Sequence, residues 1–270
     1  MSVNAEQPLN PDKAKQTRVL LGLVAIYAIL VFIYYLIAPV QAMQIPGGQT
    51  SGPDVPQWVL GLVNAGIILV VYGVAGLAGL GFARRLGLPG TYRPAAGWKG
   101  WVVWPMLAGS IVGVIIVLVD RLFTPAIRAA LAPGQDWQGF AHPEFPLSLI
   151  ASLTAGIGEE ILFRSFVLGF WAYLLNLLLR RWGATRLALW TANIIAAVAF
   201  AASHIATATL LVGVATPAEL PPAILAELLL LNGILGLVAG GLSFRDGLVA
   251  AIGVHFWADI VWHTLYPLIK

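Results

Sequence analysis

The chain contains no cysteine and few charged residues, and both absences narrow what it can do. Without cysteine it forms no disulfides, thiolate zinc sites, iron–sulfur clusters or cysteine nucleophiles. Charged residues make up only 10% of its 270 residues, whereas soluble proteins average about 25%. Hydrophobic residues reach 59%, and the mean hydropathy is +0.87. So few charged side chains cannot cover the surface of a soluble protein of this size, and the composition therefore predicts a membrane protein.

Seven apolar segments are each long enough to cross a membrane, for which a helix needs about 20 residues. Their expected bounds are 19–38, 58–83, 102–123, 147–179, 189–212, 223–242 and 248–269. We therefore expect an all-α, polytopic transmembrane bundle of about seven spans. The fourth segment is too long for one straight crossing, and we expect it to break near Gly156 and Gly158.

The basic residues alternate between the connections of these spans. Eleven of the fifteen Lys and Arg lie before the first span or in every second connection, three lie on the opposite side, and Arg164 is inside a span. This asymmetry places the N-terminus in the cytoplasm and accounts for the net charge of +3 without nucleic-acid binding. We expect residues 1–18 to be a disordered cytoplasmic tail, 19–146 a three-span region and 147–270 a four-span catalytic core.

Ionisable side chains gather in three of the last four spans, where each costs at least a few kcal/mol. The residues of these three polar segments are Glu159, Glu160 and Arg164, then Phe200 and His204, then His255 and Asp259. Such a concentration in lipid-crossing segments indicates a functional site.

Helical spacing sorts these residues into pairs. Glu160 and Arg164 stand at positions i and i+4, which predicts a structural ion pair on one helix face. Glu159 lies about 100° further round the helix, so it is left without this cationic partner. His255 and Asp259 are also i and i+4, and we expect them to project into one space.

Simpler interpretations apply to each residue taken alone. A buried Glu–Arg pair often only joins two helices, and a lone intramembrane histidine such as His204 is often a satisfied core residue. His263 continues the face of His255 but lies near the external end, and His142 falls in an external loop, where we expect it to be solvated. The occurrence of acid–base residues on three separate spans favours a function for the set.

The motifs Glu-Glu-x-x-x-Arg, Phe-x-x-x-His and His-x-x-x-Asp follow one another in this order on membrane helices. Together they resemble the CPBP family of intramembrane glutamic proteases, which includes CAAX prenyl endopeptidases and bacteriocin-processing or self-immunity proteins. The resemblance covers roughly residues 147–269. It implies that Glu159 and His204 orient and activate a water molecule, and that His255 and the residue at Asp259 bind the oxyanion.

Asp259 departs from the resemblance, because prenyl endopeptidases usually have asparagine there. An ionised aspartate is a poor hydrogen-bond donor to an oxyanion. Asp259 is therefore either protonated, or it holds His255 as the imidazolium so that the histidine donates. We favour the second arrangement.

These observations predict an intramembrane endopeptidase that hydrolyses a peptide bond with water activated by a glutamate and a histidine. An unpaired glutamate in an apolar site, as expected for Glu159, is suited to accept a proton near neutral pH. The expected partners are the lipid bilayer and a peptide or protein substrate at or in the membrane, with no nucleic acid, cofactor or metal. We expect a multi-pass protein of a cell membrane, of prokaryotic type.

Three alternatives stay open at this stage. Glu159, His204, His255 and Asp259 are all acceptable zinc ligands, although no His-Glu-x-x-His motif is present. Carboxylates and histidines in a bundle also serve proton-coupled transporters, although no repeat of the spans is evident. The third alternative is a catalytically silent immunity or scaffold protein, because intact motif residues show capacity and not turnover.

Overall fold

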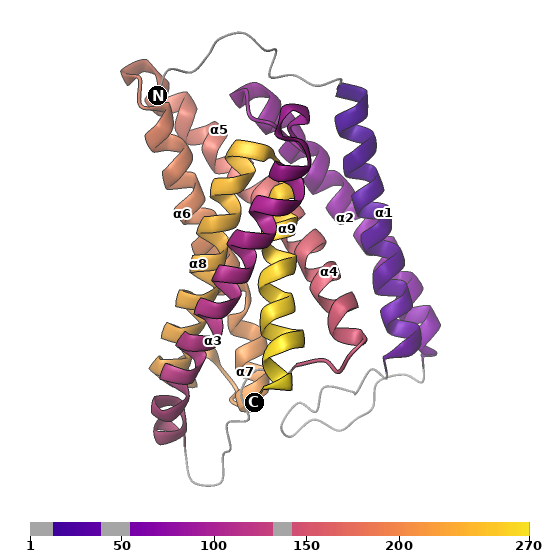
Figure 1. Ribbon diagram of the computed structural model, residues 1–270, viewed down its shortest axis with the longest axis vertical. Coiled ribbons are helices and arrows are strands. Elements are labelled where there is room, and N and C mark those ends of the chain that lie inside the picture. Colours follow the sequence, from indigo (N-terminus) through magenta and orange to yellow (C-terminus); the bar gives the residue numbers. More distant parts are fainter. Residues whose placement is uncertain (1–12, 39–54, 132–141, 270) are drawn as a thin grey trace.

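The computed structural model describes residues 13–38, 55–131 and 142–269, which form helices and connections without a β-strand (Figure 1). Seven helical stretches in these ranges are long and apolar enough to cross a membrane, so the predicted helical bundle is confirmed. The spans are Lys13–Ile37, Gln57–Leu86, Lys99–Ala130, Leu147–Trp182, Thr185–Val212, Pro222–Asp246 and Leu248–Leu268. Residues 1–12 of the expected tail lie outside the described residues.

Several spans consist of more than one helical element. The first two spans are α1 (Lys13–Ile37) and α2 (Gln57–Leu86), and the third is η2 (Lys99–Val103) with α3 (Trp104–Ala130). The fourth consists of α4 (Leu147–Glu160), η3 (Ile161–Val167), α5 (Leu168–Leu179) and η4 (Arg180–Trp182). The fifth is α6 (Thr185–Ser203) with α7 (Ile205–Val212), and the sixth is α8 (Pro222–Asp246). The seventh is α9 (Leu248–Asp259), η6 (Ile260–Leu265) and η7 (Tyr266–Leu268), and two short turns are η1 (Pro94–Ala96) and η5 (Pro217–Glu219).

Helix α1 begins at Lys13, six residues before the expected start, so residues 13–18 belong to the helix and not to a disordered tail. The reason is a set of tertiary hydrogen bonds that a hydropathy window does not detect. The side chain of Gln16 accepts hydrogen bonds from the backbone N–H groups of Thr91 and Tyr92, at 2.7 and 3.2 Å. Arg84 donates to the carbonyl of Lys13 at 3.1 Å. The end of α2 and the connection that follows it thus hold the polar first turns of α1.

Helix α9, yellow in Figure 1, lies at the centre of the bundle and packs against α3, α4 and α8. Close approach of these helices depends on small residues, as is common in membranes. At Gly109 of α3 an added Cβ would overlap the backbone carbonyl of Val254 on α9. At Gly240 of α8 it would overlap the side-chain oxygen of Asn193 on α6. Helices α1 and α2 pack together on the other side of α4.

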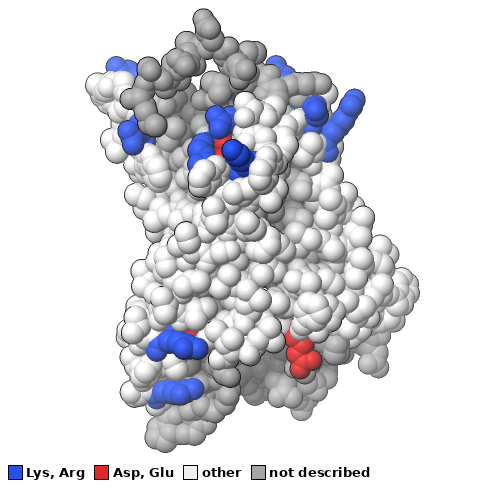
Figure 2. All heavy atoms as spheres, viewed as in Figure 1, with Lys and Arg blue, Asp and Glu red and all other residues white. Residues whose placement is uncertain are grey.

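The two ends of the bundle differ in charge. Figure 2 shows most of the visible Lys and Arg gathered at one end and few at the other. The basic end is where α2 and α5 end and where α6 begins, and it carries the eleven Lys and Arg that the sequence assigns to one side. The other end carries the connection from α7 to α8 and the start of α4.

Candidate functional site

Each of the three polar segments lies at an irregularity of its helix. Helix α4 ends at Glu160 and continues as the π-helical turn η3, and α9 ends at Asp259 and continues as the π-helical turn η6. His204 is the single residue between α6 and α7. Short π-helical turns are uncommon and are frequent at functional sites, because the wider turn changes the direction of the side chains beside it.

The expected break at Gly156 and Gly158 is wrong in position. Both glycines lie inside α4, and the irregular turn begins after Glu160. Their small size serves packing instead. A Cβ at Gly158 would come within 2.5 Å of the ring of Tyr27, and one at Gly156 would contact the backbone of Phe256.

Glu160 is fully buried and lies between Arg164 and His255. Its Oε2 is 3.1 Å from Nε of Arg164, one turn along the helix, and both side chains have 0% exposure. Its Oε1 is 2.9 Å from Nδ1 of His255 on α9. A carboxylate paired with arginine only accepts hydrogen bonds, so Nδ1 of His255 donates to it. Glu160 therefore holds both Arg164 and the imidazole of His255.

Glu159 faces the cavity and its side chain is 34% exposed. Its Oε2 lies 3.6 Å from Nε2 of His255, and Oδ2 of Asp259 lies at the same distance from the same nitrogen. Both separations exceed a direct hydrogen bond, so these contacts are electrostatic. Nε2 of His255 is thus flanked by two carboxylates, while Nδ1 is bound to a third.

His204 contributes its ring from the junction of α6 and α7. Its Nδ1 lies 3.0 Å from the carbonyl oxygen of Phe200, which can only accept, so Nδ1 carries the proton and Nε2 remains for another partner. The ring of Phe200 is edge-on to His204 at 5.0 Å and to His255 at 5.6 Å. The guanidinium of Arg164 lies over the same ring, 4.9 Å from its centroid. Phe200 therefore joins the three polar segments.

One cavity of about 420 Å³ brings Glu159, His204, His255 and Asp259 together. This volume is within the usual range for binding sites of small ligands or side chains. Its remaining lining residues are Ile116, Ala155, Thr207, Ala208, Leu211, Leu228, Leu231, Asn232, Leu235, Trp262 and His263. Glu160 and Arg164 do not line it. The structure thus separates the two neighbouring glutamates.

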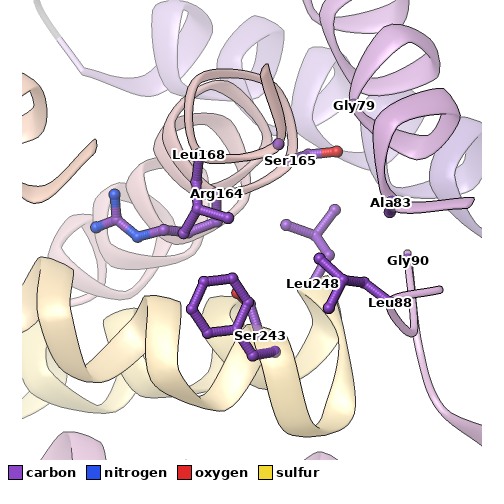
Figure 3. Close-up of a pocket in the computed structure, with 11 residues that line it drawn as sticks. Gly79, Ala83, Leu88, Gly90, Arg164, Ser165, Leu168, Ser243 and Leu248 are labelled. Atoms are coloured by element: carbon purple, nitrogen blue, oxygen red, sulfur yellow. The ribbon is translucent and has the colours of Figure 1, made fainter. Parts of the chain in front are cut away.

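A second hollow, between α2, α5, α8 and α9, is too small to be a binding site. Figure 3 shows its lining, which includes Gly79, Ser165, Ser243 and Leu248. Its volume is about 30 Å³, which has room for no more than a few water molecules. Arg164 borders it, but Figure 3 shows the guanidinium extending away from the other lining residues.

Sequence reasoning missed the contacts that cross between helices. The bond from His255 to Glu160 joins residues 95 positions apart, and Asn232 reaches the cavity from a span without a motif. The expectation that His142 is solvated is wrong, because its Nδ1 lies 3.2 Å from Nδ1 of His263. Its ring also contacts Trp262 at 4.9 Å. Helical periodicity relates residues of one helix only, so none of these contacts had a signal in the spacing.

The zinc alternative requires at least three side chains that converge on one ion. In the ranges that the structure describes, no group of three or more His, Asp or Glu side chains is arranged in this way. Instead, the carboxylates of Glu159 and Asp259 lie beside Nε2 of His255, and His204 borders the same cavity from another helix.

Residues 141–261 match a family model described as Rce1-like, type II CAAX prenyl endopeptidase. The matched region begins just before α4, and it contains all three polar segments. This region of the chain is therefore similar to the Rce1-like family. The predicted resemblance is thereby confirmed, and the chain is a multi-pass membrane protein with a protease-family core. No curated protein and no solved structure matches the chain. The first three spans lie outside the Rce1-like region.

Proposed function

We propose that the protein is an intramembrane endopeptidase in which Glu159 and His204 activate the water molecule that attacks a peptide bond. Peptide hydrolysis needs a base for water, a stabiliser for the oxyanion and a proton for the leaving amine. The main support for the proposal is that Glu159 and Glu160, although adjacent in the sequence, have different surroundings. Glu160 is bound on both oxygens, whereas Glu159 borders the cavity beside His255.

His255 is suited to stabilise the oxyanion. Glu160 fixes the ring through Nδ1, so that Nε2 is directed toward Glu159 and Asp259. Three carboxylates around one imidazole favour its charged form by Coulomb attraction, and an imidazolium donates from Nε2 as well. Asp259 then acts as a counter-charge in the place of the asparagine amide. This arrangement agrees with the role predicted from the sequence, with Glu160 as an additional holder of the ring.

The leaving amine needs a proton after the carbonyl carbon is attacked. Glu159 takes this proton from the attacking water, and the protonated carboxyl can return it to the amine nitrogen, so that the base is regenerated. His204 helps to orient the water through its remaining Nε2. The expected substrate is a peptide or protein at or in a cell membrane, and the expected host is prokaryotic.

Cleavage of a peptide library by the purified protein in detergent tests the proposal. Glu159→Gln removes the base while keeping the shape of the side chain, and the loss of a general base lowers turnover by about 10²- to 10⁴-fold. Glu144→Gln is the matched control, because Glu144 is an exposed glutamate outside the cavity. Normal cleavage by Glu159→Gln would contradict the assignment. No cleavage by the wild type, with a phenotype that depends on a partner protein, would favour an immunity or scaffold protein.

A further inference from the structure

The basic end of the bundle carries far more positive than negative charge. The sequence assigns eleven Lys and Arg to it, and within residues 13–38, 55–131 and 142–269 Asp246 is the only Asp or Glu at that end. Figure 2 shows Lys and Arg side chains gathered around an acidic group there. The described part of the protein therefore neutralises little of this charge, and the surroundings of Asp246 are a candidate site for an anion.

Asp246, the last residue of α8, holds two arginines in place. It is 1% exposed, and its Oδ1 accepts a hydrogen bond from Nη2 of Arg93 at 2.8 Å. Its Oδ2 accepts from Nε of Arg245 at 2.6 Å. The two arginine side chains are nevertheless 40% and 47% exposed. One carboxylate neutralises only one of two guanidinium groups, so the trio keeps a net positive charge on its exposed side.

Further donors around this carboxylate have no partner in the described ranges. Arg245 uses only Nε for Asp246, which leaves both of its Nη groups without a protein acceptor there. Lys99 is exposed and forms no ion pair with a described residue. It precedes Gly100, where an added Cβ would lie 3.1 Å from the carboxyl carbon of Asp246. We call Arg93, Lys99 and Arg245 the basic cluster, which carries three positive charges against one negative charge.

Backbone contacts fix the position of the basic cluster. The N–H group of Arg93 donates to the carbonyl of Asp246 at 3.0 Å, and the indole of Trp101 donates to the carbonyl of Arg93 at 3.1 Å. The connection that contains Arg93 is thereby bound to the end of α8 and to η2. A site whose groups are already held in place loses less conformational entropy when it binds a ligand.

Two exposed tryptophans indicate the depth of the basic cluster in the membrane. Trp98 is 66% exposed and precedes Lys99 in the chain. Trp104 is 50% exposed, and the guanidinium of Arg245 lies over its ring, 5.9 Å from the centroid. Tryptophan is enriched where a membrane protein passes through the lipid headgroups. The basic cluster therefore lies at the level of the phospholipid phosphates.

We propose that the basic cluster binds the phosphate of an anionic phospholipid such as phosphatidylglycerol, with the acyl chains beside Val102 and Trp104. The guanidinium groups present donors in a geometry that fits phosphate oxygens. The surplus of positive charge favours an anionic headgroup over a zwitterionic one, which brings its own ammonium group. Val102 and Trp104 are each 50% exposed and offer an apolar surface next to the charges. The proposal does not depend on protease activity, because the cavity beside Glu159 is lined by other residues.

Native mass spectrometry of the delipidated, full-length protein tests the site, with phosphatidylglycerol and phosphatidylcholine added at equal concentrations. The test variant combines Lys99→Gln with Arg245→Gln, which leaves Asp246 paired with Arg93. The wild type should prefer phosphatidylglycerol by about tenfold or more, since each basic residue near the membrane surface contributes about fivefold. Lys99→Gln alone should lower this preference about fivefold, and the double variant should abolish it. No preference in the wild type, or an unchanged preference in Lys99→Gln, would overturn the proposal.

The matched control combines Lys13→Gln with Lys15→Gln, which removes the same charge from exposed positions at the same end of the bundle. This control should keep the preference of the wild type. An equal loss of preference in the control and in the test variant would show a general effect of charge, and would overturn a site at the basic cluster. Displacement of the lipid by excess inorganic phosphate would assign the cluster to soluble phosphate instead.

The remaining acidic residues near this end in the sequence are Glu6 and Asp12, which precede α1. A full-length variant with Glu6→Gln and Asp12→Asn should bind phosphatidylglycerol as the wild type does. A preference that arises only in this variant would mean that the chain's own carboxylates occupy the basic cluster, and would overturn the lipid as its occupant. Glu159→Gln should also bind as the wild type does, so failure of the proposed chemistry is distinguishable from failure of the lipid site.

Discussion

Two adjacent glutamates of one helix point into different parts of the bundle. One part is the packed region around Phe200 and Arg164, which we call the closed half, and the other contains the cavity beside His255, which we call the cavity half. Glu160 points into the closed half, where it has 0% exposure and binds Arg164 and His255. Glu159 points into the cavity half and is 34% exposed. Because neighbouring residues of a helix differ by about 100° in direction, one helix serves both halves. The difference shows that local packing, and not the type of residue, separates a structural carboxylate from one that is available for chemistry.

The largest expected effect on stability is that of Glu160→Gln. Removing one partner of a buried ion pair leaves an uncompensated charge on Arg164, which costs about 3–5 kcal/mol. Glu159→Gln should change the free energy of unfolding by less than about 1 kcal/mol, because Glu159 is partly exposed and its nearest cationic candidate, His255, lies 3.6 Å away. Denaturant unfolding of both variants in detergent measures the difference. Equal losses of unfolding free energy in Glu160→Gln and Glu159→Gln would contradict this difference between the two glutamates.

The next largest effect compares an aliphatic side chain of the packed core with one that lines the cavity. Ile157 is 2% exposed in the core between α1 and α4, and Ile157→Ala should cost about 2–5 kcal/mol. Leu211 lines the cavity and is 45% exposed, so Leu211→Ala should cost less than about 1 kcal/mol. The same unfolding measurement applies. If Leu211→Ala lowered the free energy of unfolding as much as Ile157→Ala, the side chains around the cavity would be packed as tightly as those of the core.

A smaller loss of stability is expected where helices approach most closely. Gly109→Ala places a methyl group against the carbonyl of Val254, and such overpacking costs about 1–3 kcal/mol. Gly66→Ala is the matched control on α2, because nothing lies within 4 Å of its added Cβ. That control should be neutral or slightly stabilising, since alanine favours helices more than glycine does. Similar unfolding midpoints for the two variants would contradict the close packing of α3 on α9.

Asp259→Asn gives the subtlest effect, a change in the pH dependence of cleavage. The carboxylate lies 3.6 Å from Nε2 of His255 and is one of three that favour the imidazolium. With one counter-charge removed, the imidazolium is less favoured, so the alkaline limb of the pH–rate profile should move to lower pH. Glu160 still binds Nδ1, so activity at low pH should persist. A profile that overlays that of the wild type would show that Asp259 does not control the charge of His255.

Much of the fold was predictable from hydropathy and charge, because a membrane span must be a long apolar helix and leaves a strong local signal. All seven spans were predicted, with ends that differ by a few residues. The start of α1 was missed because Gln16 is buried by hydrogen bonds to residues about 75 positions away. The position of the break in the fourth span was also missed, because a π-helical turn has no simple sequence signature.

The candidate site was predictable only where helical spacing within one span relates its residues. The spacing of Glu160 and Arg164 placed them on one face, and the structure has their atoms at 3.1 Å. The roles of Glu159, His204, His255 and Asp259 stay predictions, although one cavity contains all four. The contact of Glu160 with His255 and the approach of His142 to His263 had no local signal.

The sequence by itself determined which segments cross the membrane, which end carries the positive charge and which residues share a helix face, since each depends on composition or on the period of one helix. Only the tertiary structure decided how these faces meet. It directs Glu160 into packed surroundings and Glu159 into a cavity, and it places His255 of α9 between them. The physical reason is that helix packing depends on small contacts between distant segments, such as Gly109 against Val254, and these set the spaces that remain between helices.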